Sequence, residues 1–269
     1  MIEFKNIKKS FGDKIVLNDV SHVMQTGACN LIIGTSGSGK TVLQKCLVGL
    51  FEPDEGEIIY DGISFTDMTE ENRKELRQQI GMLFQGSALF DSMTVEQNVM
   101  FPLDMFSNLS SHDKQKRVNE VLARVALVDA NKKYPAEISG GMKKRVGIAR
   151  AIVLNPKYLF CDEPNSGLDP QTSMVIDKLI YEITKEFNMT TVINTHDMNS
   201  VMEIGENILY MYQGQKEWSG NNKEIIFSKN DRLNSFIFAS EFLQDAKDMR
   251  MLEAKGKISD DRNMDELLK

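Results

Sequence analysis

A glycine-rich segment near the N-terminus has the residue types and spacing of a phosphate-binding loop. Residues 34–41 read Gly-Thr-Ser-Gly-Ser-Gly-Lys-Thr and fit the pattern G-x-x-x-x-G-K-[ST]. Small residues let successive backbone N–H groups turn inward around phosphate oxygens at the start of a helix. We expect Lys40 to reach the β- and γ-phosphates of a nucleotide and Thr41 to bind Mg²⁺. The predicted nucleotide-binding residues of this segment are Gly34, Ser36, Gly37, Ser38, Gly39, Lys40, Thr41 and Val42.

Two adjacent carboxylates follow an apolar run later in the chain. Residues 159–161 read Leu-Phe-Cys and are followed by Asp162 and Glu163. An acidic pair at the end of a strand is common, so on its own it is equally consistent with surface charge. Beside a phosphate loop, Asp162 could hold Mg²⁺ directly or through water, opposite Thr41. Glu163 would then be placed to polarise an attacking water. The two segments together predict a site for nucleotide hydrolysis.

A third segment narrows the class of nucleotide-binding protein. Residues 138–142 read Ile-Ser-Gly-Gly-Met and precede the basic stretch 143–150. A Ser-Gly-Gly sequence at a helix start can present a hydroxyl, uncovered N–H groups and the positive end of the helix dipole to a γ-phosphate. With the first two segments, it resembles the signature of the ATP-binding-cassette (ABC) ATPases, which usually reads Leu-Ser-Gly-Gly-Gln. The resemblance implies that Ser139, Gly140 and Gly141 contact the γ-phosphate of ATP.

Four further residues occur in the order in which ABC ATPases place their functional elements. By this resemblance, Phe11 stacks on adenine and Gln85 forms a glutamine loop that serves catalysis and Mg²⁺ binding. Asp169 belongs to an aspartate loop at the nucleotide site, and His196 is the catalytic switch histidine. Simpler interpretations exist, since Phe11 could pack against a core and a lone histidine after a strand is more often structural. Their order along the chain favours the functional interpretation.

The resemblance covers residues 1–228 and implies an architecture. It predicts an α/β protein with a RecA-like P-loop NTPase core, an antiparallel β subdomain and a helical subdomain inserted at about residues 86–155. Residues 229–269 remain as a C-terminal extension. In this family two copies pack head to tail, and each ATP lies between the phosphate loop of one chain and the Ser-Gly-Gly segment of the other. We therefore expect an ATPase that uses ATP and Mg²⁺ as a dimer with a second copy of itself.

Two features suggest a subfamily. Met142 replaces the usual glutamine, and residues 83–95 read Leu-Phe-Gln-Gly-Ser-Ala-Leu-Phe-Asp-Ser-Met-Thr-Val. Both resemble the Mla-type (Mce-associated) ATPases of phospholipid and lipid transport. The resemblance implies an integral-membrane permease, whose coupling helix would insert at residues 86–99, and a lipid-binding Mce-type protein. The alternative is a soluble ABC ATPase without a permease, such as an iron–sulfur-cluster assembly ATPase.

The secondary-structure pattern supplies the elements that must position these residues. Apolar runs at 28–33, 80–84, 158–161 and 191–193 are typical of buried strands. Helical spacing of apolar residues predicts helices after the phosphate loop and over 175–183, where Val175, Ile176, Leu179, Ile180 and Ile183 would share one face. Helical periodicity dominates residues 94–154. The alternation predicts a largely parallel sheet covered on both sides by helices.

Composition limits the class of partner. The chain has 269 residues, 41% of them hydrophobic, and a net charge of −7. Because phosphate neutralisation requires a basic face, we expect no nucleic-acid partner. We find no signal peptide or membrane-spanning run, so we expect a cytoplasmic protein, peripheral on the cytoplasmic face of the inner membrane. Cys29, Cys46 and Cys161 lie in apolar stretches and read as reduced packing residues. We expect the charged tail to be partly disordered.

Overall fold

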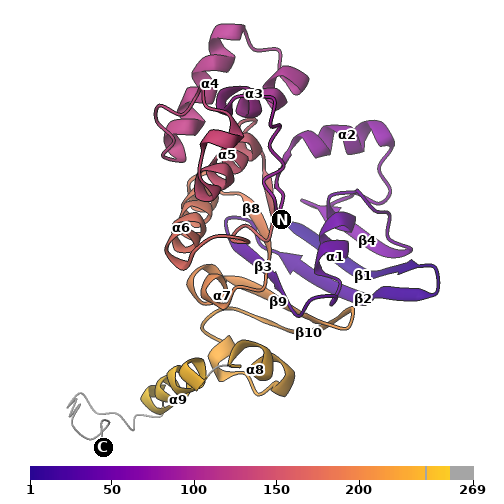
Figure 1. Cartoon of the computed structure of the whole chain (residues 1–269). Helices are drawn as coiled ribbons and strands as arrows, with labels where there is room; N and C mark the ends of the chain where they lie inside the picture. Colours follow the sequence, from indigo (N-terminus) through magenta and orange to yellow (C-terminus); the bar gives the residue numbers. More distant parts are fainter. Residues whose placement is uncertain (240, 255–269) are drawn as a thin grey trace, which may run out of the picture.

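A six-stranded sheet forms the centre of the protein (Figure 1). The computed structural model describes residues 1–239 and 241–254. The strand order is β10-β9-β3-β8-β7-β6. Strands β3, β6, β7, β8 and β9 run parallel to their neighbours, and β10 pairs antiparallel with β9. The carboxyl ends of β3, β7 and β8 therefore meet at one edge. The strands are β3 (Cys29–Ile33), β6 (Ile80–Leu83), β7 (Tyr158–Asp162), β8 (Thr190–Thr195), β9 (Asn207–Tyr212) and β10 (Gln215–Gly220).

A second, antiparallel sheet lies beside the first, at the right of Figure 1. Its order is β2-β1-β4-β5, with β1 (Ile2–Phe11), β2 (Lys14–Met24), β4 (Glu55–Tyr60) and β5 (Ile63–Ser64). The residue pattern predicts β1, from Ile2, Phe4 and Ile7, and β4, from the run 56–62 between turns, but it does not predict β2. The pairing of β1 with β2 contains register shifts, and Asp19 within β2 has φ of 61°. These irregularities break the strict alternation by which a strand is recognised.

Helices cover the sheets and form one separate layer. Helices α3, α4 and α5 gather at the top of Figure 1, away from the antiparallel sheet. Helix α3 begins with a capping box in which Thr94 accepts a hydrogen bond from the backbone N–H of Gln97. The helices are α1 (Lys40–Leu47), α2 (Glu70–Gln78), α3 (Val95–Phe106), α4 (Ser111–Arg124), α5 (Gly140–Ile152), α6 (Pro170–Glu186), α7 (Met198–Ile204), α8 (Asp231–Ile237) and α9 (Glu241–Ala254), with short 3₁₀ turns η1 (Pro135–Glu137) and η2 (Ile225–Phe227).

Two apolar clusters explain why the central strands read as continuous apolar runs. Leu31 and Ile33 of β3 point into a cluster with α3 to α7, whereas Ile32 points into a cluster with α1 and the antiparallel sheet. Strands buried on both faces need no polar alternation. On α6, four of the five predicted core residues are buried, but Val175 is exposed, so the predicted face was one residue too wide.

The three cysteines are buried and free, as predicted from their apolar surroundings. Cys29 and Cys161 belong to the first cluster and Cys46 to the second. Burial raises the pKa of each thiol, to about 12 for Cys29 and about 11 for Cys46. These thiols stay protonated and are poor nucleophiles and poor metal ligands.

Part of the C-terminal extension packs on the chain itself. Leu233, Ile237 and Phe238 are buried in the first cluster, and Phe236 stacks on Tyr210 of β9 with ring centroids 5.4 Å apart. Helix α8 is therefore part of the fold, at the bottom of Figure 1. The prediction of a partly disordered tail covered residues 229–269, of which 229–239 and 241–254 are described and carry α8 and α9, whereas residues 240 and 255–269 lie outside the described residues.

Candidate nucleotide-binding site

The phosphate loop joins the end of β3 to the start of α1 and depends on glycine. Gly34 has φ of 149°, and a Cβ there would lie 2.3 Å from the Met211 carbonyl oxygen and 2.7 Å from Ser38 Oγ. Gly39 caps α1 with φ of 101°, and no side chain among the described residues caps that helix. The first N–H groups of α1 are therefore available to an anion, and the helix dipole favours one.

Lys40 lies in the loop with its ammonium group held by backbone oxygens. The side chain is buried, and Nζ donates to the Gly34 carbonyl at 2.8 Å and the Thr35 carbonyl at 3.1 Å. Burial lowers the pKa of Lys40, while the negative charges of Glu163 and Asp162 oppose that shift. The sheet edge therefore brings the predicted phosphate-binding lysine into the field of both predicted carboxylates.

The acidic pair lies where β7 ends beside β8. Asn194 of β8 donates from Nδ2 to Asp162 Oδ1 at 3.3 Å, and its carbonyl accepts the Glu163 N–H at 2.9 Å. Glu163 has φ of 48°, in the left-handed region, so the backbone turns sharply as it leaves the strand. His196 follows β8, and its Nδ1 lies 2.7 Å from Glu163 Oε2. The structure thus joins two residues that sequence analysis connected only by motif order.

Gln85 follows β6, at the same end of the parallel sheet as Glu163. Its neighbour Lys144 is a residue of the site that sequence analysis missed. Gln85 is exposed, and its Nε2 donates to Ser166 Oγ at 3.4 Å. The buried Lys144 of α5 donates to the carbonyl oxygens of Gln85 and of Glu163, the latter at 3.4 Å. One ammonium therefore links the glutamine loop, the end of β7 and the helix that starts at Ser139. The basic stretch 143–150 was noted in the sequence, but only the fold shows which of its cations turns inward.

Ser139 and Asp169 each begin a helix on the exposed surface. Ser139 caps α5 and accepts from the Met142 N–H at 3.3 Å, and Asp169 caps α6 and accepts from the Thr172 N–H at 2.9 Å. A Cβ on Gly141 would lie 2.6 Å from Thr172 Cγ2, which keeps these helix starts close together. In the described part of the chain, no hydrogen bond or ion pair joins Ser139 or Asp169 to the phosphate loop of the same chain. Both remain available to a second chain.

Phe11 lies at the end of β1, where it pairs with Lys14 across the hairpin. It is 45% exposed and meets Phe51 edge to face at 5.4 Å, so most of its ring face is not used for core packing. Lys14 begins β2, and Leu17 of this strand contacts the phosphate loop: a Cβ on Gly39 would lie 2.9 Å from Leu17 Cδ2. The hairpin therefore belongs to the neighbourhood of the loop, as adenine stacking by Phe11 requires.

We expect Phe11→Ala to weaken ATP binding by about 1–3 kcal/mol, the typical value of aromatic stacking on a nucleobase. Titration calorimetry with a non-hydrolysable ATP analogue measures this loss directly. Phe187→Ala is the matched control, because Phe187 is similarly exposed, at 40%, but lies at the opposite end of α6 from Asp169. Equal affinities for wild type and Phe11→Ala would place the adenine elsewhere.

The residues present fit a nucleotide with Mg²⁺. Within the described part of the chain, Ser38 Oγ is buried in the loop without a hydrogen-bond partner, and the start of α1 has no side-chain cap. Thr41 and Asp162 supply the oxygen donors that Mg²⁺ prefers. No cluster of three or more His, Cys, Asp or Glu suited to a metal occurs in the part of the chain that the structure describes. A Mg²⁺ ion that takes its remaining ligands from phosphates and water needs no such cluster.

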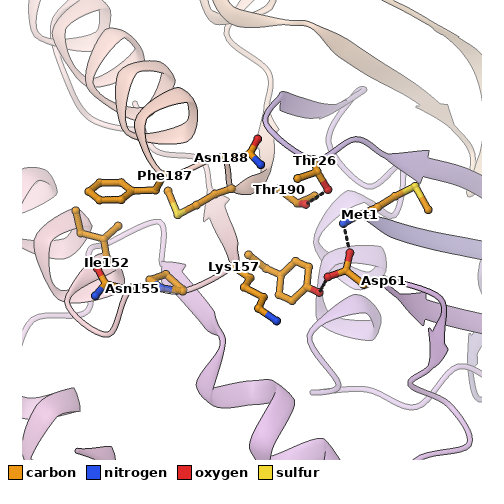
Figure 2. Close-up of a pocket in the computed structure, with 12 residues that line it drawn as sticks. Met1, Thr26, Asp61, Ile152, Asn155, Lys157, Phe187, Asn188 and Thr190 are labelled. Carbon is orange, nitrogen blue, oxygen red and sulfur yellow. Dashed lines mark hydrogen bonds and ion pairs between the residues drawn. The ribbon is translucent and has the colours of Figure 1, made fainter.

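A further pocket lies away from this site. Figure 2 shows a cavity of about 360 Å³ in which Asp61 accepts from the Met1 ammonium group and from the Tyr158 hydroxyl, the latter at 2.6 Å. Tyr158 and Thr190 begin β7 and β8, so this cavity lies at the amino ends of the parallel strands. Nucleotides bind at the opposite, carboxyl edge of such sheets. The cavity of Figure 2 is therefore not the nucleotide site.

A phosphate loop after β3, a carboxylate pair at the end of β7 and a histidine after β8 are the arrangement of a P-loop nucleotide hydrolase. Residues 17–166 match the family model described as ABC transporter. A methionine import ATP-binding protein of Campylobacter jejuni is 39% identical over 90% of this chain and 77% of its own length. A probable ribonucleotide transport ATP-binding protein of Mycobacterium tuberculosis is 36% identical over 88% of this chain and 66% of its own length. The chain belongs to the ABC transporter family, as an ATP-binding subunit.

Solved structures agree with this assignment. The ATP-binding cassette MJ0796, in a dimeric post-hydrolysis state with ADP and Pi, superposes with a TM-score of 0.74 at 32% identity, covering 82% of this chain and 99% of its own. The cassette CbiO1 of Clostridium perfringens gives 0.78 at 31% identity, covering 85% of this chain and 91% of its own. The predicted ABC ATPase fold and the use of ATP and Mg²⁺ are confirmed, and the protein couples ATP hydrolysis to transport.

Such cassettes work as dimers with a membrane permease. None of the helices described here is both long and apolar enough to cross a membrane. The predicted ABC transporter class is confirmed. The relatives are named for methionine and ribonucleotide transport, so they do not show the predicted lipid cargo.

Proposed function

We propose that this chain is the ATP-hydrolysing subunit of a transporter that moves phospholipid or another lipid across the cell envelope, on the cytoplasmic face of the inner membrane. The observation that carries the ATPase role is the 2.7 Å contact between Glu163 and His196 at the edge that holds Lys40. The lipid cargo is supported by Met142 and by residues 83–95, which resemble the Mla-type ATPases. An Mce-type protein would then be a further partner.

The proposed roles of the site residues follow from their positions. Lys40 and the loop N–H groups bind phosphate, while Thr41, Asp162 and Gln85 hold Mg²⁺. Glu163 orients the attacking water and accepts its proton, and His196 fixes the Glu163 carboxylate. Ser139, Gly140, Gly141 and Asp169 serve the site of a second chain. This role is supported by the exposure of Ser139, Gly140 and Asp169 and by the partial exposure of Gly141. Hydrolysis then removes γ-phosphate contacts that hold two chains together.

A groove beside Gln85 is proposed to receive the permease. A cavity of about 690 Å³ lies between α2, β6, α3 and α5. Its apolar lining includes Phe84, Phe90, Phe101 and Phe106, and its charged lining residues are all cationic: Lys74, Arg77 and Arg150. Residues 86–99, where the coupling helix was predicted to insert, contribute part of this wall. The lining fits a short amphipathic helix that carries an acidic residue.

We expect Phe106→Glu to reduce capture of the permease by about 30-fold, which corresponds to the loss of a hot-spot contact of about 2 kcal/mol. Phe106 is 49% exposed at the end of α3, so the isolated chain should keep its fold and its nucleotide affinity. Phe227→Glu is the matched control, because Phe227 is 51% exposed on η2 at the other end of the chain. Co-purification of membrane proteins from the native host measures both variants. If Phe106→Glu captured the permease as well as the wild-type chain does, the groove would not be the permease-binding site.

Methionine import is the second candidate, because named relatives perform it. The complex captured with the wild-type chain separates the two. Stimulation of its ATPase by phospholipid vesicles, and an Mce-type protein in the complex, would support lipid transport. Stimulation by L-methionine with its binding protein would overturn it. A complex without any permease would support a soluble ABC ATPase instead.

A further inference from the structure

Three polar side chains form a closed network behind the catalytic edge. Asn165 donates from Nδ2 to Asp177 Oδ1 and to Ser200 Oγ, each at 2.9 Å, and Ser200 donates to Asp177 Oδ2 at 2.8 Å. Asp177 is 3% exposed and Ser200 is fully buried. Asn165 Oδ1 is buried and has no hydrogen-bond partner among the residues that the structure describes, so both amide donors are used while the acceptor is left unsatisfied. No other part of the proposed mechanism uses these residues.

The network joins the two segments that carry Glu163 and His196. Asn165 lies two residues after Glu163, in the turn closed by the Ser166 N–H to the Glu163 carbonyl at 3.1 Å. Ser200 lies in the first turn of α7, four residues after His196. Beyond the pairing of β7 with β8, which ends in the Glu163 N–H to Asn194 carbonyl bond, the two segments meet through the Glu163–His196 contact and again through Asn165, Asp177 and Ser200. Asp177 of α6 is the anchor, because it accepts from both.

This arrangement is unfavourable for stability on its own. Burial raises the pKa of Asp177 to about 6, and the carboxylates of Asp197 and Glu203 on α7 add to the shift. A buried carboxylate with two donors is generally no more stable than a well-packed apolar group. Glu163 also needs support, since its left-handed φ of 48° is strained for a residue with a Cβ. The need to hold a strained catalytic turn accounts for a polar anchor at this place.

We propose that Asn165, Asp177 and Ser200 are positioning residues that hold the Glu163 turn at the correct distance from His196 for attack of water on ATP. The proposal rests on the proposed catalytic role of Glu163. Because the three side chains lie behind the turn and not in the phosphate loop, they act on hydrolysis and not on ATP binding.

Asp177→Ala removes both acceptors and should lower kcat about 10-fold, because small displacements of a catalytic group reduce rates steeply. KM for ATP should change less than about 2-fold, since the loop is untouched. Asp177→Asn keeps an oxygen that accepts from Asn165 Nδ2, and its amide N–H can donate to Ser200 Oγ, which reverses the direction of the second bond. Because both contacts can still form, it should restore kcat to within about 2-fold of wild type. Steady-state turnover and melting temperature are measured for each variant of the full chain.

Thr184→Val is the matched control on the same helix. Thr184 is fully buried and hydrogen-bonds the Ile180 carbonyl and Thr191 Oγ1, both at 2.7 Å. It lies nearer the C-terminal end of α6 than Asp177 does. It should lower the melting temperature without changing kcat. Ser200→Ala and Asn165→Ala repeat the test if Asp177→Ala does not fold. Normal kcat in these variants would overturn the proposal. So would a fall in kcat that follows the fall in melting temperature and occurs equally in Thr184→Val, because it would reflect lost stability alone. If Glu163→Gln itself kept full turnover, the proposed function would fail first, which separates the two outcomes.

Discussion

Glu163→Gln is expected to bind ATP with near-normal affinity while its hydrolysis falls by about 10²–10⁴-fold, the usual contribution of a general base. The amide is nearly isosteric with the carboxylate, so the turn after β7 and the contact with His196 Nδ1 can persist. The amide cannot accept a proton from water, and it removes one negative charge that faces the γ-phosphate. ATP-bound dimers should therefore accumulate. Phosphate release and molar mass by light scattering, measured with ATP and Mg²⁺, test both consequences.

Two further variants make this result specific. Glu182→Gln changes an exposed carboxylate of α6 that pairs with Arg124 at 3.4 Å, and it should hydrolyse ATP normally. Ser139→Arg, added to Glu163→Gln, places bulk and charge where the γ-phosphate of a second chain's ATP must lie. It should abolish the dimers and leave ATP binding by each phosphate loop. Normal turnover by Glu163→Gln would refute the general base, and persistent dimers with Ser139→Arg would refute the composite site.

The parts of the site that sequence could predict are those encoded over short distances. The order of strand, glycine-rich loop and helix around Lys40 is local, and so is the apolar strand that ends at Asp162. The contact of Glu163 with His196 was not predicted, since sequence analysis connected the two residues only by motif order; it arises because parallel strands bring their carboxyl ends to a single edge. Family resemblance supplied the roles of Phe11 and Gln85, which no local pattern distinguishes from packing or surface residues.

The parts that sequence could not predict depend on contacts between distant residues. Asn165 follows Glu163 by two residues, but its partners lie 12 and 35 residues away and no local pattern marks them. In the sequence, Lys144 is one of several cations in a basic stretch, and only the fold shows that its ammonium group contacts Gln85 and Glu163. Side-chain direction at such positions is fixed by tertiary packing, which the spacing of residue types along a chain does not contain.

Lys40→Ala is expected to abolish productive ATP binding. Lys40 is the ammonium group held inside the loop, and each charge-assisted hydrogen bond that it makes to phosphate contributes about 1.5–3 kcal/mol. Two such bonds, to the β- and γ-phosphates, amount to about 3–6 kcal/mol, or a loss of affinity of at least about 100-fold. The fold should survive, because the Lys40 ammonium donates to the carbonyls of Gly34 and Thr35 within its own loop, and to no other group among the described residues.

Calorimetric titration of Lys40→Ala with an ATP analogue and Mg²⁺ measures this loss. Lys157→Ala is the matched control, because Lys157 lies in the cavity of Figure 2 at the amino ends of the strands and should bind ATP normally. The comparison with Glu163→Gln separates the two halves of the mechanism. Lys40→Ala should show neither ATP binding nor ATP-driven dimers, whereas Glu163→Gln should show both without hydrolysis. Retained affinity and turnover in Lys40→Ala would mean that the phosphates are held by other groups, and the assignment of the loop would have to be abandoned.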